Sequence, residues 1–382
     1  MDTPALTAYM EAHVDQMLAR LKELVEHESP STDKLHLDRL AEHLARRWES
    51  LGAVVSIIDN PVRGNHLCIS LPSVVSGPSV APILLLGHFD TVWPIGTLAR
   101  RPFTVEATRA MGPGVCDMKG GLVIAEFALQ AISNLALPLS RPITLMVNSD
   151  EEIGSTTSRG LIEAEAALAK AVLVLEPATP SGALKTARKG VGGYTVTVTG
   201  RASHAGVAPE EGVSAIEELA HQVLRLHQMT DLESGTTVNV GLFEGGTRPN
   251  VVAAEAQARV DVRVWTRQEA ERVDAAIRGL QPLNAATQLS VTGGFERFPM
   301  ERNAGTRQLF TVARRVGQDL GLVVQEGSSG GGSDGNFTAA MGVPTLDGLG
   351  AVGDGSHADH EFVQVASLPQ RAALLAALMC EL

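Results

Sequence analysis

Short, uninterrupted runs of Val, Ile and Leu alternate along this 382-residue chain with stretches of helical periodicity. Such continuous apolar strands are typical of an α/β fold, a mostly parallel sheet covered by helices on both faces. The predicted strands are VVSIID (54–59), HLCISL (66–71), ILLLG (83–87), ITLMVN (143–148) and AVLVLE (171–176). The predicted helices are 4–26, 35–51, 118–134 and 157–170.

The pattern changes at about residue 190, where YTVTVTG (194–200) alternates polar and apolar residues as a half-exposed strand does. The next predicted elements are a helix at 212–229, strands at 236–243 and 254–265, a helix at 267–280 and a strand at 287–293. This β-α-β-β-α-β order is that of the ferredoxin-like unit. Helices return at 303–320 and 368–381. We therefore expect one α/β domain over 1–188 and 300–382, with an α+β domain inserted at 189–299.

The charge balance excludes several kinds of partner. The chain has 31 Lys and Arg against 43 Asp and Glu, a net charge of −12. A general nucleic-acid binder needs a basic surface, and an anionic membrane attracts polybasic segments, so we expect neither partner. No apolar run is long enough to span a membrane, and the N-terminus lacks the pattern of a secretory signal. The three cysteines form no CxxC pair, which is typical of reduced thiols, so we expect a cytoplasmic protein.

Acidic and histidine side chains follow the predicted strands, at the point where each strand ends. His88 and Asp90 follow ILLLG, Glu151 and Glu152 follow ITLMVN, and Glu176 ends AVLVLE. Asp117 lies in a glycine-rich loop, GPGVCDMKGG, before a predicted helix. Because open α/β sheets bind ligands outside the carboxyl ends of their strands, these groups should converge. Several carboxylates in one crevice need a cation, and the imidazole favours zinc over magnesium or calcium.

Each of these residues alone has a simpler explanation. A single histidine after a strand is more often a hydrogen-bonded surface residue, and paired glutamates can begin a helix. Asp117 could cap a helix, Glu176 could be a solvated strand end, and GSSGGGSDG (327–335) could be a flexible linker. The recurrence of these residues at successive strand ends in one chain favours a functional site.

Six ordered motifs carry a resemblance to a known family: GHFDTVWP, MGPGVCDMKGG, NSDEEIGS, LEP, GRASHAG and GGGSDG. Together they resemble the zinc metallopeptidase family of glutamate carboxypeptidase, acetylornithine deacetylase and aminoacylase, over nearly the whole chain. The segments GHFDTVWPIGTLARRPF and GRASHAGVAPEEGVSA are most similar to bacterial folate-cleaving glutamate carboxypeptidases. The resemblance implies a zinc-exopeptidase-like catalytic domain, an inserted ferredoxin-like lid and dimerisation domain, and a homodimer.

The same resemblance implies a centre with two zinc ions. Asp117 would bridge the ions, His88 and Glu176 would complete one site, and Glu152 with a C-terminal histidine the other. GDGSHADHEFV offers His357 and His360 for that position, and the spacing to Glu361 favours His357. Glu151 would be the general base, taking a proton from water and returning it to the leaving amine. Asp90, two residues beyond His88 on an extended strand, points the same way and can orient its ring.

Substrate contacts are also implied by the resemblance. His204 would reach across a dimer interface to help hold the oxyanion, and Asn250 and Arg263 match positions that contact substrate. On its alternation with Val262 and Val264 alone, Arg263 is an outward strand charge. Backbone N–H groups at Gly331, Gly332 and Ser333 could bind an α-carboxylate, with Arg263 as a clamp and Arg297 as a weaker candidate. Cys116 is expected to be a loop packing residue, and Trp93 could either pack or touch substrate.

These expectations describe a zinc-dependent carboxypeptidase that releases a C-terminal, glutamate-like amino acid from N-acyl or peptidyl substrates. An N-acyl-amino-acid deacylase or deacetylase would use the same chemistry with a different pocket, and a dipeptidase is a further alternative. A ligand-binding scaffold with an inactive site is the alternative from another class.

Overall fold

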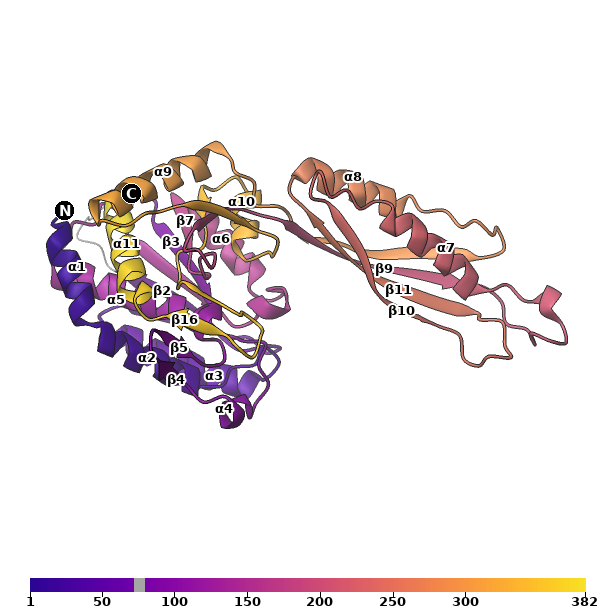
Figure 1. The fold of residues 1–382 in the computed structure, drawn as a ribbon, viewed down its shortest axis with the longest axis horizontal. Coiled ribbons are helices and arrows are strands. Elements are labelled where there is room, and N and C mark those ends of the chain that lie inside the picture. The colour runs from indigo at the N-terminus through magenta and orange to yellow at the C-terminus, as the bar shows by residue number, and fades with distance from the viewer. Residues whose placement is uncertain (72–79) are drawn as a thin grey trace. The chain divides into compact units, whose positions relative to one another are not determined.

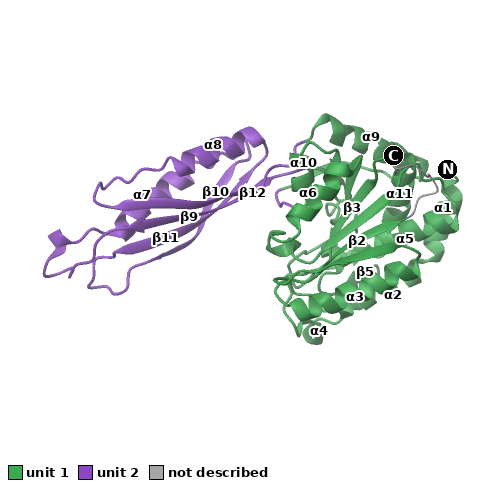
Figure 2. Cartoon of the chain, turned by 180° about the vertical axis from the view of Figure 1, so that it is seen from behind, with its two compact units in different colours: residues 1–186, 302–329, 333–382 green, residues 187–301, 330–332 purple. Residues whose placement is uncertain are grey.

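The computed structural model describes residues 1–71 and 80–382 (Figure 1). The chain divides into two compact units (Figure 2). Unit 1 comprises Met1–Thr186, Arg302–Ser329 and Ser333–Leu382, and unit 2 comprises Ala187–Glu301 and Gly330–Gly332. The expected insert at 189–299 lies within unit 2, which also takes in 330–332. Among the helices of the described residues, none has the length and apolarity needed to cross a bilayer.

Unit 1 is built on a six-stranded sheet with the order β1-β2-β6-β3-β7-β14. Its strands are β1 (Val54–Ile58), β2 (His66–Leu71), β3 (Ile83–His88), β6 (Ile143–Asn148), β7 (Ala171–Val174) and β14 (Thr345–Leu346). The pairs β3–β6, β3–β7 and β7–β14 are parallel, whereas β2 is antiparallel to both β1 and β6. A mostly parallel sheet was expected, and β2 is the exception in it. The short 59–65 connection from β1 allows this reversal, since a parallel pairing needs a long crossover.

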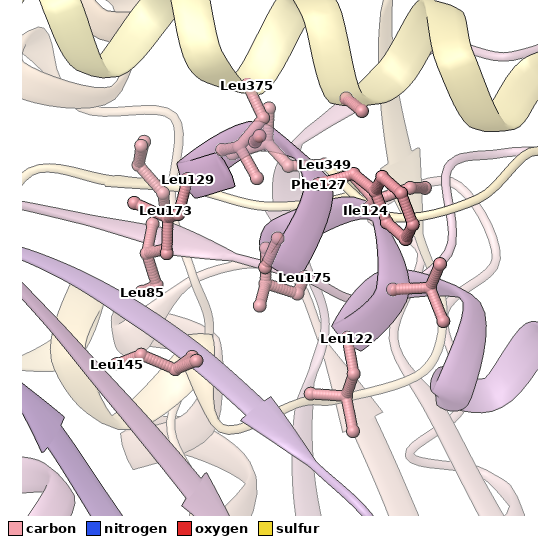
Figure 3. Packing of buried hydrophobic residues seen from close by; sticks show 14 of the residues in the cluster. Leu85, Leu122, Ile124, Phe127, Leu129, Leu145, Leu173, Leu175, Leu349 and Leu375 are labelled. Atoms are coloured by element: carbon pink, nitrogen blue, oxygen red, sulfur yellow. The ribbon is translucent and has the colours of Figure 1, made fainter. Parts of the chain in front are cut away.

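Helices cover both faces of this sheet, because successive side chains of a strand point to opposite faces. On one face, Leu85, Leu145 and Leu173 pack in a cluster with α5 and α11 (Figure 3). On the other face, Leu84, Leu86 and Met146 pack against Ile162 of α6. The helices of the first cluster are α1 (Thr3–Ala12), α2 (Val14–Glu26), α3 (Lys34–Ser50), α5 (Gly120–Asn134), α9 (Ala304–Asp319) and α11 (Ser367–Glu381). The helix expected over 4–26 is therefore two helices that meet at His13.

Shorter elements complete unit 1. They are α4 (Thr97–Arg100), α6 (Arg159–Leu168), α10 (Gly335–Ala340), β8 (Leu184–Arg188, which runs into unit 2) and β13 (Glu326–Ser329). A small antiparallel sheet has the order β15-β16-β5-β4, with β4 (Thr104–Glu106), β5 (Arg109–Met111), β15 (Gly353–Asp354) and β16 (Phe362–Gln364). In this sheet β16 pairs with β5. The C-terminal segment with His357 is thereby held beside the segment that leads into Asp117.

Unit 2 has an antiparallel four-stranded sheet with the order β10-β11-β9-β12. Its elements are β9 (Gly190–Thr199), α7 (Ala215–His227), β10 (Thr237–Gly245), β11 (Glu255–Val264), α8 (Arg267–Arg278) and β12 (Gln288–Arg297). This is the β-α-β-β-α-β order predicted from the sequence. Apolar residues at alternate strand positions, such as Val196, Val198 and Val262, form the core with Leu219 of α7 and Val273 of α8.

Candidate active site

The candidate site lies at the carboxyl ends of the parallel strands of unit 1. His88 is the last residue of β3, and it is in register with Asn148, the last residue of β6. Glu151 and Glu152 follow β6 in a short 3-10 turn, and Glu176 lies two residues beyond β7. Because the three strands are parallel neighbours, their ends bring these side chains to one edge of the sheet.

The carboxylate of Asp117 lies between two histidines and presents a different oxygen to each. Oδ1 is 3.3 Å from Nε2 of His88, and Oδ2 is 3.5 Å from Nε2 of His357. The His88 nitrogen is also 3.5 Å from Oε1 of Glu176, and the His357 nitrogen is 2.9 Å from Oε2 of Glu152. Two ligands of one tetrahedral zinc, each about 2 Å from the ion, lie about 3.3 Å apart. The donor atoms therefore have the separations of two metal sites that share Asp117.

Two further observations fit a divalent cation. Ligand atoms of His88, Asp117 and Glu152 lie within 4.8 Å of one another, as do those of His88, Glu151 and Glu176. Oε1 of Glu152 is buried and has no hydrogen-bond partner among the described residues, an arrangement that is costly unless a cation binds there. Carboxylates combined with imidazoles are the donor set that suits zinc better than all-oxygen cations.

The cluster has strongly perturbed electrostatics. Burial opposes the charged form of His88, but the carboxylates of Asp117, Asp90 and Glu176 outweigh it and hold the pKa of His88 well above its ordinary value. The hydrogen bond that His357 donates to Glu152 raises the pKa of His357 to about 9. Burial, together with the charge of Asp117, raises the pKa of Glu152 to about 7. A cation that binds here must therefore displace protons from these groups.

Asp90 is fully buried and lies between His88 and the turn that carries Glu151 and Glu152. Its Oδ1 accepts a hydrogen bond from the backbone N–H of Glu151 and its Oδ2 from that of Glu152, each at 3.2 Å. Nδ1 of His88 lies 3.1 Å from the Asp90 carbonyl oxygen and 3.4 Å from its Oδ1. Asp90 thus positions the ring of His88 and the turn that carries both glutamates.

These contacts bear on which C-terminal histidine, His357 or His360, would be the metal ligand. His357 lies against Glu152 and Asp117, and its backbone is in the left-handed region with φ 64°. His357 and His360 are both exposed and belong to neither group of clustered ligand atoms, so the contacts of His357 with Glu152 and Asp117 are what separates the two candidates. The geometry therefore favours His357.

Cys116 and Trp93, two loop residues considered in the sequence analysis, have the surroundings of packing residues. Cys116 is buried, burial raises the pKa of its thiol well above the ordinary value, and it belongs to neither ligand group. The indole N–H of Trp93 donates to Oε2 of Glu361 at 3.1 Å, and Arg101 lies over its ring, 4.4 Å from the centroid. Sequence reasoning used Glu361 only as a spacing marker. Its partners are more than two hundred residues away in the chain, so no local pattern could have shown its contacts.

Three of the expected substrate residues, and the weaker candidate Arg297, lie in the Ala187–Glu301 segment of unit 2. His204 and Asn250 are exposed, and Nδ1 of His204 accepts from the N–H of Gly206 at 3.2 Å. Arg263 is half-buried and makes a two-pronged ion pair with Asp261 on the same face of β11, as the strand alternation predicts. Asp261 therefore already uses part of the guanidinium that was expected to bind the carboxylate of a substrate. Arg297 is buried at the end of β12.

The donors of one residue in the expected anion-binding loop bond within the protein. Ser333 is fully buried, its N–H donates to Oδ1 of Asn336 and its hydroxyl donates to Oδ2 of Asp347, at 2.9 and 2.7 Å. Both donors are used within unit 1, so Ser333 is not a free donor for substrate. The carbonyl oxygens of Gly331 and Gly332 accept from Nη1 of Arg188, which holds that part of the loop within unit 2.

Comparison with known proteins identifies the family. Residues 84–381 match the profile described as peptidase family M20/M25/M40. The chain belongs to this family. It is 32% identical over 379 residues to carboxypeptidase G2 of Pseudomonas sp. (strain RS-16), covering 96% of this chain and 89% of that protein. This M20 chain is thus an enzyme of a metallopeptidase family with carboxypeptidase relatives.

Solved structures show that the fold is shared. The aminopeptidase PepT of Bacillus cereus superposes with a TM-score of 0.79 and 24% identity, covering 96% of this chain and 98% of that one. The YXEP protein of Bacillus subtilis, described as a dinuclear metal binding peptidase from the M20 family, has a TM-score of 0.71 and 14% identity, covering 97% and 98%. At these identities the likeness concerns the M20 fold and not the substrate.

Proposed function

We propose that this M20 peptidase is a carboxypeptidase with two zinc ions, which hydrolyses the amide bond before a C-terminal amino acid. The observation that carries the proposal is the position of Asp117, whose two oxygens face two histidines, each with its own glutamate. His88 and Glu176 would hold one ion, and His357 and Glu152 the other. The B. subtilis fold neighbour is described as dinuclear, which supports the count.

Residues of the chain would have separate roles around these ions. Bound zinc supplies Lewis-acid chemistry, which polarises the scissile carbonyl and eases the loss of a proton from water. Glu151, held by its backbone bond to Asp90, would take that proton and return it to the leaving amine. Asp90 would keep His88 oriented through its Nδ1.

The substrate side of the proposal follows the resemblance of GHFDTVWPIGTLARRPF and GRASHAGVAPEEGVSA to bacterial glutamate carboxypeptidases. The carboxypeptidase G2 relative supports the carboxypeptidase part of it. We infer a preference for a C-terminal glutamate-like residue on an N-acyl or peptidyl donor, with the backbone N–H groups of Gly331 and Gly332 as candidate carboxylate donors. We also infer a homodimer formed through unit 2, in which His204 serves the partner's site. An exposed outer strand supports this, since β10 is at the edge of its sheet, with Leu242 and Phe243 53% and 43% exposed.

The test is amino-acid release from a panel of N-acyl substrates by the zinc-loaded protein. The panel varies the C-terminal residue (Glu, Asp, Ala, Phe, Arg) and the acyl group (acetyl, benzoyl, glycyl, a pteroyl-like aryl group). We expect the highest kcat/KM for glutamate with bulky acyl groups. Preference for acetyl donors would assign the chain to deacetylation with the same site chemistry, and an inert zinc-loaded protein would contradict the proposed activity.

A further inference from the structure

Glu361 is only 1% exposed, and its carboxylate accepts hydrogen bonds from four N–H groups. Its Oε1 accepts from the backbone of Cys116 at 2.8 Å and of Asp117 at 3.1 Å. Its Oε2 accepts from the backbone of Gly114 at 2.8 Å and from the indole of Trp93 at 3.1 Å. Hydrogen bonds to an ionised acceptor are shorter and stronger than neutral ones, so this carboxylate is a strong local constraint.

These donors come from segments that carry proposed metal ligands. Trp93 lies on the loop that follows His88, and Gly114–Asp117 is the loop that carries the shared carboxylate. Glu361 itself follows His357 by one turn, in which Ala358 donates to Gly355 and Glu361 donates to Ala358. One buried side chain therefore ties together the segments of His88, Asp117 and His357, all within unit 1.

The loop held by Glu361 has little freedom of its own. Gly114 has φ 72°, and a Cβ there would lie 2.6 Å from Cγ2 of Thr91. The bond to the Asp117 N–H fixes the backbone of the residue whose Oδ1 and Oδ2 must face opposite histidines. Hydrogen bonds behind a metal ligand orient it toward the metal, and the bond to the Asp117 N–H would have this effect on the shared carboxylate.

We propose that Glu361 is a positioning residue that assembles the two halves of the metal centre before metal binds. It does not touch the ions or the substrate, and it acts through Asp117 and the loop of His88. This inference rests on the proposed two-metal function. It predicts that the loss of Glu361 weakens metal binding, and that turnover returns when metal is supplied in excess.

Glu126 provides a matched comparison, because its carboxylate in α5 is also buried, at 2% exposure, and multiply bonded. It accepts from Arg20, Arg47 and Gln130, none of which is a proposed ligand. Glu126→Gln therefore measures what the loss of a buried carboxylate does to the fold alone. Trp93→Phe removes one of the four donors and leaves Glu361 in place.

The experiment measures zinc affinity of the metal-stripped full-length chain by competition with a chromogenic chelator, alongside Tm and kcat. In Glu361→Gln the amide NH2 group is a donor, so it cannot accept hydrogen bonds from the N–H groups of the loop. We therefore expect the zinc affinity of at least one site to fall about 10- to 100-fold. Excess zinc should restore kcat to within about threefold of wild type. Trp93→Phe should lose affinity to a smaller extent, and Glu126→Gln should lower Tm with unchanged zinc affinity.

Wild-type zinc affinity in Glu361→Gln, with a fall in Tm like that of Glu126→Gln, would overturn the inference. If Glu361→Gln does not fold, Trp93→Phe decides, and an unchanged zinc affinity in that variant would overturn it. A wild-type chain that binds no zinc would instead refute the proposed function, together with this inference. The two failures are thus distinguished by the wild-type titration.

Discussion

Glu151 and Glu152 are adjacent in sequence but have different surroundings. The side chain of Glu152 is 6% exposed. One of its oxygens lies 2.9 Å from His357, and the other is buried with no hydrogen-bond partner in the part of the chain that the structure describes. Glu151 belongs instead to the group with His88 and Glu176, although Asp90 holds the backbone N–H of both glutamates. In the proposed function, Glu152 would be a metal ligand and Glu151 would be the base beside the metal.

This difference gives a prediction for two isosteric substitutions. Glu151→Gln should retain zinc and lose about 10²- to 10⁴-fold in kcat, the usual contribution of a general base. Glu152→Gln should lose zinc as well as activity, because it removes a ligand oxygen. Zinc per chain after desalting and kcat of each variant check both statements. Near-wild-type turnover in Glu151→Gln would contradict the assigned mechanism.

At the scale of elements, the site depends on how closely α5 approaches the end of β7. A Cβ on Gly121, in the first turn of α5, would lie 2.0 Å from the carbonyl oxygen of Leu175. Leu175 immediately precedes Glu176, and the turn of Asp117 immediately precedes α5. The absence of a side chain at Gly121 therefore brings two proposed ligand segments together.

Gly121→Ala should consequently destabilise the fold by about 1–3 kcal/mol, the usual effect of overpacking, with a lower Tm. Gly160 in α6 is the matched control, since a Cβ there meets nothing within 4 Å. Gly160→Ala should be neutral or stabilising by up to about 1 kcal/mol, because alanine is the better helix former. Equal changes in Tm for the two variants, measured by thermal unfolding, would argue against the close approach.

The sequence predicted the long elements and the convergence of the strand ends that carry the proposed ligands, because both depend on local patterns. Hydrophobic runs place β3, β6 and β7, and the polar residues that follow them converge as parallel strands require. The reversed β2 and the small sheet of β5 and β16 depend on pairings between distant short segments, which carry no periodicity. For the same reason, neither the contacts of Glu361 nor the inward bonds of Ser333 were visible in the sequence.

At the scale of the whole molecule, the proposed dimer makes His204 of one chain part of the other chain's site. Two inactive variants test this when they are co-expressed with different tags and the mixed dimer is purified. In a dimer of Glu151→Gln with His204→Ala, one site retains Glu151 from its own chain and His204 from its partner. We expect that mixed dimer to regain about half of the wild-type activity per dimer. If His204 serves its own chain, the mixed dimer should remain inactive.

The strands that begin and end unit 2 are neighbours, and this has a consequence for the order of folding. Arg188 and Met300 exchange backbone hydrogen bonds, and Nε of Arg302 donates to the hydroxyl of Thr186 at 2.8 Å. In an unfolded chain, bringing the two ends of so long an insert together costs about 4 kcal/mol of loop-closure entropy. Once β9 and β12 have paired, that cost no longer opposes the docking of α9, β14 and α11 on the rest of unit 1. If unit 2 folds early during synthesis, it would thus bring the C-terminal segment back beside the strands of unit 1 that have already been synthesised.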